Sequence, residues 1–257
     1  MNEMPKTPRV GTAGWSIPAA QADRFPVEGS HLQRYSQRLP AVEINSSFYR
    51  PHRASTYKRW AASVPPDFRF AVKISKEVTH TRRLANTAEP LARFLEEVRL
   101  LGPKLGPLLI QLPPSLVFHQ DLVADFLRYL RTSFAGDLAC EPRHPSWFTD
   151  EVDAVLVEHR IARVAADPAP VPRAAEPGGW QALNYFRLHG SPRMYYSPYP
   201  QAFLDRLRHR LSSLNVEVWC IFDNTAEGAA THDALAVKTE TVCPGVGVSP
   251  GLPGPAA

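Results

Sequence analysis

The chain has 257 residues, of which 44% are hydrophobic and 21% charged, with a formal net charge of +4 at pH 7. These values exclude a small disulfide-stapled protein and a highly charged disordered chain, and the length suits one α/β barrel of ~250 residues. The mildly basic sequence pI of about 9.0 permits an anionic partner but does not require one.

The beginning of the chain has no apolar signal core, and nowhere do about 18 apolar residues run together. We therefore expect a cytoplasmic protein with no membrane contact. Cys140 and Cys220 fall inside apolar runs, which predicts small core residues rather than a disulfide framework. Residues 1–9 are expected to form an N-terminal extension, residues 10–242 one barrel-like domain, and residues 243–257 a disordered tail rich in Pro and Gly.

Short runs typical of β-strands alternate along the chain with longer runs of helical periodicity. The strands are expected within residues 9–16, 41–49, 68–75, 106–114, 138–144, 161–168, 184–190 and 217–225. The helices are expected within residues 31–39, 55–64, 90–102, 121–132, 149–160 and 201–214, with Thr149 as a helix cap. Residues 169–181 are too rich in Pro and Gly for a helix. The order predicts an α/β fold, a single TIM-type (β/α)8-like barrel with eight parallel strands.

Six of these strands have an apolar face and a second face that becomes polar towards the carboxyl end. In the second strand, for example, Val42 and Ile44 share one face while Glu43 and Asn45 share the other. The sites of (β/α)8 barrels lie where the carboxyl ends of the strands meet, which we call the mouth. The polar residues expected at the mouth are Glu43, Asn45, Lys73, Gln111, Glu141, Arg143, Asp167, Arg187 and His189.

These side chains predict an enzyme that uses acid–base chemistry on a small polar or anionic substrate, similar to a sugar or a phosphate, as an isomerase, lyase or hydrolase. Glu141, Lys73 and Glu43 are the catalytic candidates, and Lys73 also suits a Schiff base. The candidates for binding the substrate are Arg143, Arg187, His189, Asn45, Gln111, Asp167, His144, Trp15 and Asn224. The alternative for this cluster is a salt-bridge network that fills the barrel without a ligand.

No cofactor is predicted, because neither GxxxxGK[ST] nor GxGxxG occurs, although a flavin needs no such motif in a barrel. A divalent metal is a less favoured alternative that predicts ligands among Glu43, Glu141, Asp167, His80, His144 and His189. Lys73, Arg143 and Arg187 at the same level would repel such a cation. No metal ligand is therefore assigned.

Two further classes of function stay open. Nucleic-acid binding or nuclease activity is indicated by the basic residues between Arg50 and Arg83 and by Tyr195, Tyr196 and Tyr199, since cations interleaved with aromatic rings bind single strands. These tyrosines also suit a packed lid over the mouth. The other class is a non-catalytic scaffold, which predicts paired and rigid charges.

Several ordered motifs resemble the family called domain of unknown function 72, the YecE-like proteins. They are "GTAGWS", "VEINSSFY", "FAVKISKEVTH", "IQLPPSL", "EPRHPSW", "FRLHG" and a late "DNT" block, spread over about residues 10–240. The resemblance implies one TIM-barrel-like domain and implies no particular reaction. Members of this family tend to have two asparagines near the end of the last strand, where this chain has Asp223 and Asn224.

Overall fold

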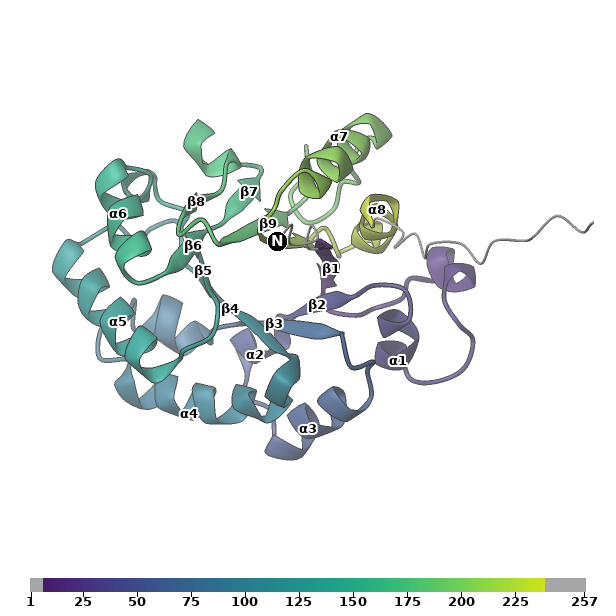
Figure 1. The fold of residues 1–257 in the computed structure, drawn as a ribbon, viewed down its shortest axis with the longest axis horizontal. Coiled ribbons are helices and arrows are strands. Elements are labelled where there is room, and N and C mark those ends of the chain that lie inside the picture. The colour runs from purple at the N-terminus through teal and green to yellow at the C-terminus, as the bar shows by residue number, and fades with distance from the viewer. Residues whose placement is uncertain (1–6, 239–257) are drawn as a thin grey trace, which may run out of the picture.

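One sheet forms the centre of the molecule, and helices surround it (Figure 1). The computed structural model describes residues 7–238. Within these residues the sheet contains ten strands in the order β7-β9-β10-β1-β2-β3-β4-β5-β6-β8. The strands are β1 (Arg9–Ala13), β2 (Ala41–Ile44), β3 (Arg69–Lys73), β4 (Leu105–Gln111), β5 (Leu138–Glu141), β6 (Ile161–Arg163), β7 (Ala165–Asp167), β8 (Gly178–Gly179), β9 (Leu183–Leu188) and β10 (Glu217–Phe222).

The helices connect the strands and cover the outside of the sheet (Figure 1). The α-helices are α1 (His31–Ser36), α2 (Ser46–Tyr49), α3 (Ala54–Ala62), α4 (Ala88–Val98), α5 (Gln120–Ser133), α6 (Asp150–Glu158), α7 (Gln201–Ser212) and α8 (Ala229–Val237). Short 3-10 segments are η1 (Ala19–Arg24), η3 (Arg99–Lys104), η4 (Pro145–Trp147) and η5 (Pro172–Ala175), and η2 (Glu77–Thr81) is a π-turn. As predicted, Thr149 caps α6, because its side chain accepts the backbone N–H of Val152.

The α/β barrel-like class is confirmed, but the prediction of eight parallel strands is wrong. The segment expected as the sixth strand forms both β6 and β7, which Val164 separates. β6 pairs with β5, while β7 pairs with β9, so this segment lies at both ends of a nearly closed sheet. Among the described strand pairs, β6 and β8 alone are antiparallel. Gly179 allows this antiparallel pairing, because its positive φ of 63° and its missing Cβ let the backbone of β8 lie against Ile161 of β6.

The two faces of the sheet differ as the alternation of residues predicts. The outward side chains, such as Val42, Phe70 and Phe186, join the large core between the strands and the helices. The inward side chains form a second, smaller core of Ala41, Ala71, Leu109, Ala139, Ala162, Val164, Leu183, Tyr185, Trp219 and Ile221. This inner core fills the barrel below the mouth, so the polar residues that follow in each strand rest on a packed apolar floor.

Two helices were not predicted. α2 follows β2 directly within the run expected as a strand, and α8 lies in the last part of the described chain. The α8 sequence is rich in alanine and has little amphipathic periodicity, and Ala230, Asp233 and Val237 are all buried there. A helix that is buried on several sides gives only a weak periodic signal in the sequence.

We expect that Gly11→Ala destabilises the barrel at the contact between β1 and β2. A Cβ atom on Gly11 would lie 2.1 Å from the carbonyl oxygen of Ala41, so the strands would have to move apart. The free energy of unfolding should fall by about 2 kcal/mol, as for other overpacked sites. Urea denaturation followed by circular dichroism measures this loss. Gly14→Ala shows the cost of backbone strain without a clash, because Gly14 has positive φ and open space around its Cβ position, and it should lose about 1 kcal/mol. A Gly11→Ala variant as stable as the wild type would contradict the steric explanation.

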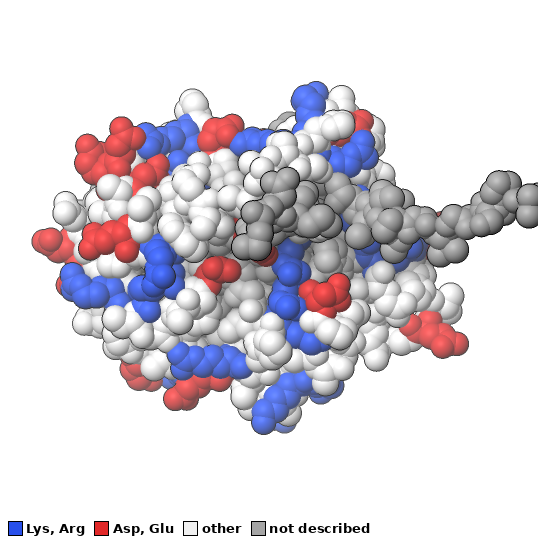
Figure 2. All heavy atoms as spheres, in the orientation of Figure 1, with Lys and Arg blue, Asp and Glu red and all other residues white. Residues whose placement is uncertain are grey.

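Charged residues of both signs are interspersed on the visible face of the molecule, with uncharged residues between them (Figure 2). This face therefore carries no continuous patch of one sign. None of the helices within residues 7–238 is long and apolar enough to cross a membrane.

Candidate active site at the barrel mouth

Arg187 is the centre of a buried cluster of charges at the mouth. Its Nη2 donates to Glu43 Oε1 at 2.7 Å, and its Nε donates to Glu43 Oε2 at 3.1 Å. Its Nη1 donates to Glu141 Oε2 at 2.6 Å. Tyr185, two residues earlier on β9, donates its hydroxyl to Glu43 Oε2 at 2.7 Å. Because Arg187, Glu43 and Glu141 are at most 1% exposed, these bonds form where water does not compete.

The second oxygen of Glu141 contacts two further predicted site residues. Glu141 Oε1 lies 2.7 Å from Arg143 Nη2 and 2.8 Å from His189 Nε2. The other ring nitrogen of His189, Nδ1, lies 3.0 Å from Asp223 Oδ2. His189 thus has a carboxylate at each nitrogen, and in its imidazolium form both N–H groups donate to these carboxylates. Arg143 Nη2 is also 2.6 Å from His189 Nε2.

The charges shift the pKa values of their neighbours in a consistent direction. Burial by itself raises the pKa of Glu141, but the nearby charges of Arg187, Arg143 and His189 outweigh burial and hold it well below the usual range. The pKa of Asp223 is lowered in the same way, since Arg187 and the His189 hydrogen bond outweigh its burial. Both carboxylates are therefore ionised at neutral pH, and Glu141 is a weak proton acceptor.

Lys73 differs from the other cations of the cluster. Its side chain is half-buried at the end of β3, and its Nζ lies over the ring of Phe48, 4.1 Å from the ring centroid. Within residues 7–238, no hydrogen bond or ion pair engages this Nζ, because Arg187, Arg143 and His189 occupy the nearby carboxylates. Burial and the charge of Arg187 lower the pKa of Lys73 to about 8.

His80 shares an aromatic neighbour with Lys73. It lies on η2, and its ring meets Phe48 edge to face with the centroids 4.9 Å apart. Burial lowers the pKa of His80, and the positive charges of Lys73, Lys76 and Arg83 lower it further. The side chains of His80 and Lys73 therefore lie close together, and both have lowered pKa values and release their protons more readily than usual.

Other predicted binding residues lie apart from the Arg187 contacts. Gln111 donates its amide to the carbonyl of Leu112, and the Oδ1 of Asp167 accepts the hydroxyl of Tyr199. The side-chain amide of Asn224 donates to Ser197 and to Asp233 on α8. These contacts give Gln111, Asp167 and Asn224 roles within the fold.

Three further candidates lie at the edges of the mouth. His144 precedes η4, where its Nδ1 accepts the backbone N–H of Ser146. Trp15 and Asn45 line a cavity of about 360 Å³ at the ends of β1 and β2. Trp15 meets Trp60 edge to face, and within the described part of the chain Asn45 Oδ1 is buried without a hydrogen-bond partner.

The predicted set omitted residues that contact this cluster. Tyr185 and Asp223 were omitted although strand alternation places each two residues from an inward-facing neighbour, Arg187 and Ile221. Tyr195 was considered for nucleic-acid binding and as part of a lid, but not as a contact of the cluster. Its ring meets His189 edge to face at 5.7 Å, and it is 45% exposed. Tyr199 is buried and donates to Asp167, so only this tyrosine is packed as a lid residue would be.

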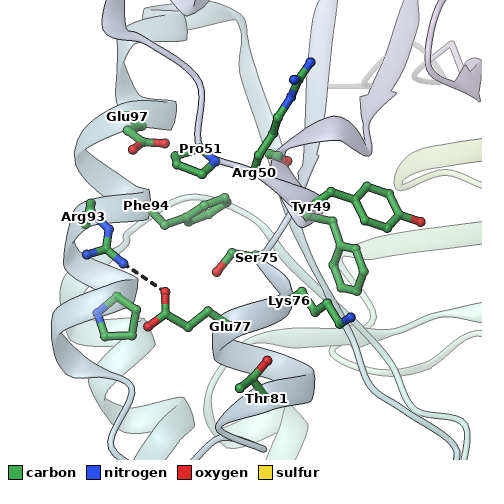
Figure 3. Close-up of a pocket in the computed structure, with 13 residues that line it drawn as sticks. Tyr49, Arg50, Pro51, Ser75, Lys76, Glu77, Thr81, Arg93, Phe94 and Glu97 are labelled. Carbon is green, nitrogen blue, oxygen red and sulfur yellow. Dashed lines mark hydrogen bonds and ion pairs between the residues drawn. The ribbon is translucent and has the colours of Figure 1, made fainter.

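A separate cavity of about 260 Å³ lies outside the barrel, between α4 on one side and α2 and η2 on the other (Figure 3). Phe94 and Arg93 of α4 face Tyr49 and Glu77 across it, and Arg93 donates to Glu77 at 2.9 Å. Phe48 also lines this cavity, so its ring lies between the cavity and Lys73.

No group of three or more His, Cys, Asp or Glu side chains within residues 7–238 is placed to hold a metal ion. In the cluster, Arg187 lies between the carboxylates of Glu43 and Glu141. The acidic side chains are thus arranged around a guanidinium group.

The fold and the cluster define an α/β barrel-like protein with a charged candidate site at the carboxyl ends of its strands. The family described as "Protein of unknown function DUF72" matches residues 9–254, and the chain belongs to this family. This confirms the resemblance found in the sequence motifs.

Curated proteins resemble this chain in sequence, and a solved structure resembles it in fold. The UPF0759 protein YecE of Escherichia coli K12 is 28% identical over 153 residues, which are 57% of this chain and 55% of that protein. The UPF0759 protein YunF of Bacillus subtilis is 28% identical over 148 residues, which are 54% and 52%. The chain thus spans about half the length of the curated relatives it matches. The crystal structure of a DUF72 family protein from Thermotoga maritima has a TM-score of 0.77 at 27% identity, over 91% of this chain and 98% of that chain.

Proposed function

We propose that the mouth is the active site of an enzyme that performs acid–base chemistry on a small polar substrate with an anionic group, such as a sugar phosphate. The observation that carries this proposal is Lys73, a half-buried cation that no carboxylate of the described chain pairs with. Amines and imidazoles with pKa values near neutrality exchange protons efficiently at the pH of the cell.

The placement of the charges supports an anionic ligand. Arg187 and Arg143 engage the carboxylates of Glu43, Glu141 and Asp223, so these carboxylates have cationic partners without Lys73. The charge of Lys73 is therefore available to a ligand in the mouth. Buried ion pairs add little net stability to a protein, because apolar side chains of similar size are often as stabilising. Stability alone therefore does not explain this network.

The contacts suggest a division of roles among the predicted catalytic residues. Glu43 and Glu141 hold Arg187 and His189 in place, because all their oxygens are engaged. Lys73 acts as the proton-transfer group, with His80 as a second one. Arg143 is partly exposed and binds the anionic group of the substrate. The reaction is an isomerisation, an elimination or a hydrolysis.

A second candidate function is binding of single-stranded nucleic acid at the rim of the mouth. Tyr49 and Tyr195 are exposed, and Arg193 lies 3.7 Å from the centroid of the Tyr196 ring. Exposed rings beside cations can stack on unpaired bases. This function predicts an affinity for oligonucleotides that falls steeply with salt.

Calorimetric titration with ribose 5-phosphate and with inorganic phosphate tests the first proposal. We expect both ligands to bind the wild type, and Lys73→Met or Arg143→Gln to weaken binding at least about tenfold, or about 1.4 kcal/mol. Lys76→Met is the matched control, since Lys76 is exposed three residues away and should not matter. Equal weakening by the control, or no binding by the wild type at millimolar ligand, would contradict the proposal. Tight, salt-sensitive binding of an oligonucleotide instead would favour the second candidate.

A further inference from the structure

We infer that Lys73 is a nucleophile that forms an imine with a carbonyl group of the substrate. The inference rests on the proposed function of the mouth and deepens it, since it names the substrate class as an aldehyde or ketone that carries an anionic group. A lysine becomes a nucleophile when it is desolvated, lies beside another cation and is not engaged by a carboxylate.

The surroundings of the Lys73 amine meet the geometric conditions. Its Nζ contacts the face of Phe48 rather than an acceptor atom. Lys104 differs from Lys73 in this respect, because the Nζ of Lys104 donates hydrogen bonds to the carbonyls of Val64 and Pro65. Lys73 is instead placed at the end of β3, on the inward face of the strand, where a ligand in the mouth would meet it.

The charged groups around Lys73 act in opposite directions, and the net effect with burial is a larger neutral fraction of its amine than in an ordinary lysine. Burial and Arg187 lower its pKa, while Glu43, Glu141 and Asp223 raise it, and the resulting value is about 8. The neighbouring His80 is also held towards its neutral form, because burial and the charges of Lys73, Lys76 and Arg83 lower its pKa. At pH 7.5 the neutral fraction of such an amine is roughly two-hundredfold larger than that of an ordinary surface lysine.

The chemical step needs no oxidant or reductant. The neutral Nζ attacks the carbonyl carbon and forms a C–N bond, and a proton moves from nitrogen to oxygen to give a carbinolamine. A second proton, taken from solvent, then converts the hydroxyl group to water, and the departure of this water breaks the C–O bond and leaves the protonated imine. His80 beside Phe48 is suited to transfer these protons. Arg143 is suited to hold the anionic group of the substrate.

The test uses two carbonyl reagents, pyridoxal 5′-phosphate and the smaller glyoxylate, with the full chain at pH 7.5. Sodium borohydride reduces any imine to a stable secondary amine, and peptide mass spectrometry then locates the label. We expect Lys73 to be labelled at least about tenfold faster than the exposed Lys58 and Lys76, a margin that allows for the weaker nucleophilicity of low-pKa amines. The rate should rise with a midpoint near pH 8. Inorganic phosphate should slow the labelling of Lys73 only.

Lys73→Arg is the control variant, because it keeps the positive charge but forms no stable imine. It should melt within a few degrees of the wild type, bind phosphate and show no label at position 73. Labelling spread evenly over the lysines, or Lys73 left unlabelled by both reagents, would overturn the inference. If Lys73 stays unlabelled while phosphate binding depends on Lys73 and Arg143, the proposed function stands and only the imine is excluded. If phosphate does not bind at the mouth at all, the proposed function fails independently of the labelling.

Discussion

Arg187→Met is expected to lower the free energy of unfolding by about 3–5 kcal/mol, because it leaves buried carboxylates without their partner. Glu43 would keep only the hydroxyl of Tyr185, and Glu141 would keep Arg143 and His189. Urea denaturation of the two proteins at pH 7 measures the loss. Arg206→Met is the control, since Arg206 is exposed on α7, and its free energy of unfolding should change by less than about 0.5 kcal/mol.

A second variant separates the lost ion pair from lost packing. In the double variant Arg187→Met, Glu43→Gln, the carboxylate that loses two hydrogen bonds from Arg187 becomes a neutral amide. We expect the double variant to be more stable than Arg187→Met alone, since the penalty comes from an unpaired buried charge. If both single and double variants were as stable as the wild type, the network would contribute nothing to stability. A double variant less stable than Arg187→Met would attribute the loss to packing instead.

Acid should destabilise the protein through Glu141 and Asp223. Their pKa values are lower in the folded state than in the unfolded chain, so their contribution is complete above the unfolded values of about 4.3 and 3.9. It is lost as the pH falls below these values towards the folded ones, at a rate of up to about 1.4 kcal/mol per pH unit for each group. The free energy of unfolding should therefore decline steeply below about pH 4.5.

Measurements on Glu141→Gln and Asp223→Asn check the assignment. Each variant lacks one of the two titrating groups, so its stability should depend less steeply on pH below pH 4.5 than that of the wild type. Glu158→Gln is the control, because Glu158 is exposed at the end of α6. Parallel curves for the wild type and both cluster variants would show that other carboxylates cause the acid sensitivity.

The site at the mouth could be predicted in part. Alternation along the strands identified Glu43, Glu141, Arg143, Arg187 and His189, and these residues contact one another in the structure. The same rule applied to β9 and β10 would have added Tyr185 and Asp223. It did not predict that Gln111 and Asp167 form hydrogen bonds with Leu112 and Tyr199, because alternation does not specify the partners that set the direction of a side chain beyond Cβ.

The catalytic assignments of Glu141, Lys73 and Glu43 remain predictions. What the structure adds is a difference between these residues that no spacing in the sequence reveals. Arg187 reaches both carboxylates from β9, more than forty positions from Glu141, while Lys73 is left beside Phe48. Such pairings depend on which side chains compete for the same acceptor in space.

The sequence by itself determined the order of eight strand segments and six helices and the inward face of residues such as Glu43, Glu141 and Arg187, because these depend on local periods of two and 3.6 residues. It did not determine how the sheet closes. Gly178 and Gly179 add a short antiparallel strand, and Val164 separates β6 from β7, since these features depend on backbone contacts between distant segments. Only the tertiary structure decided which cation of the mouth forms no ion pair within residues 7–238. Burial and competition for carboxylates act between neighbours in space. As a result, the Nζ of Lys73 lies over the ring of Phe48 and has a lowered pKa.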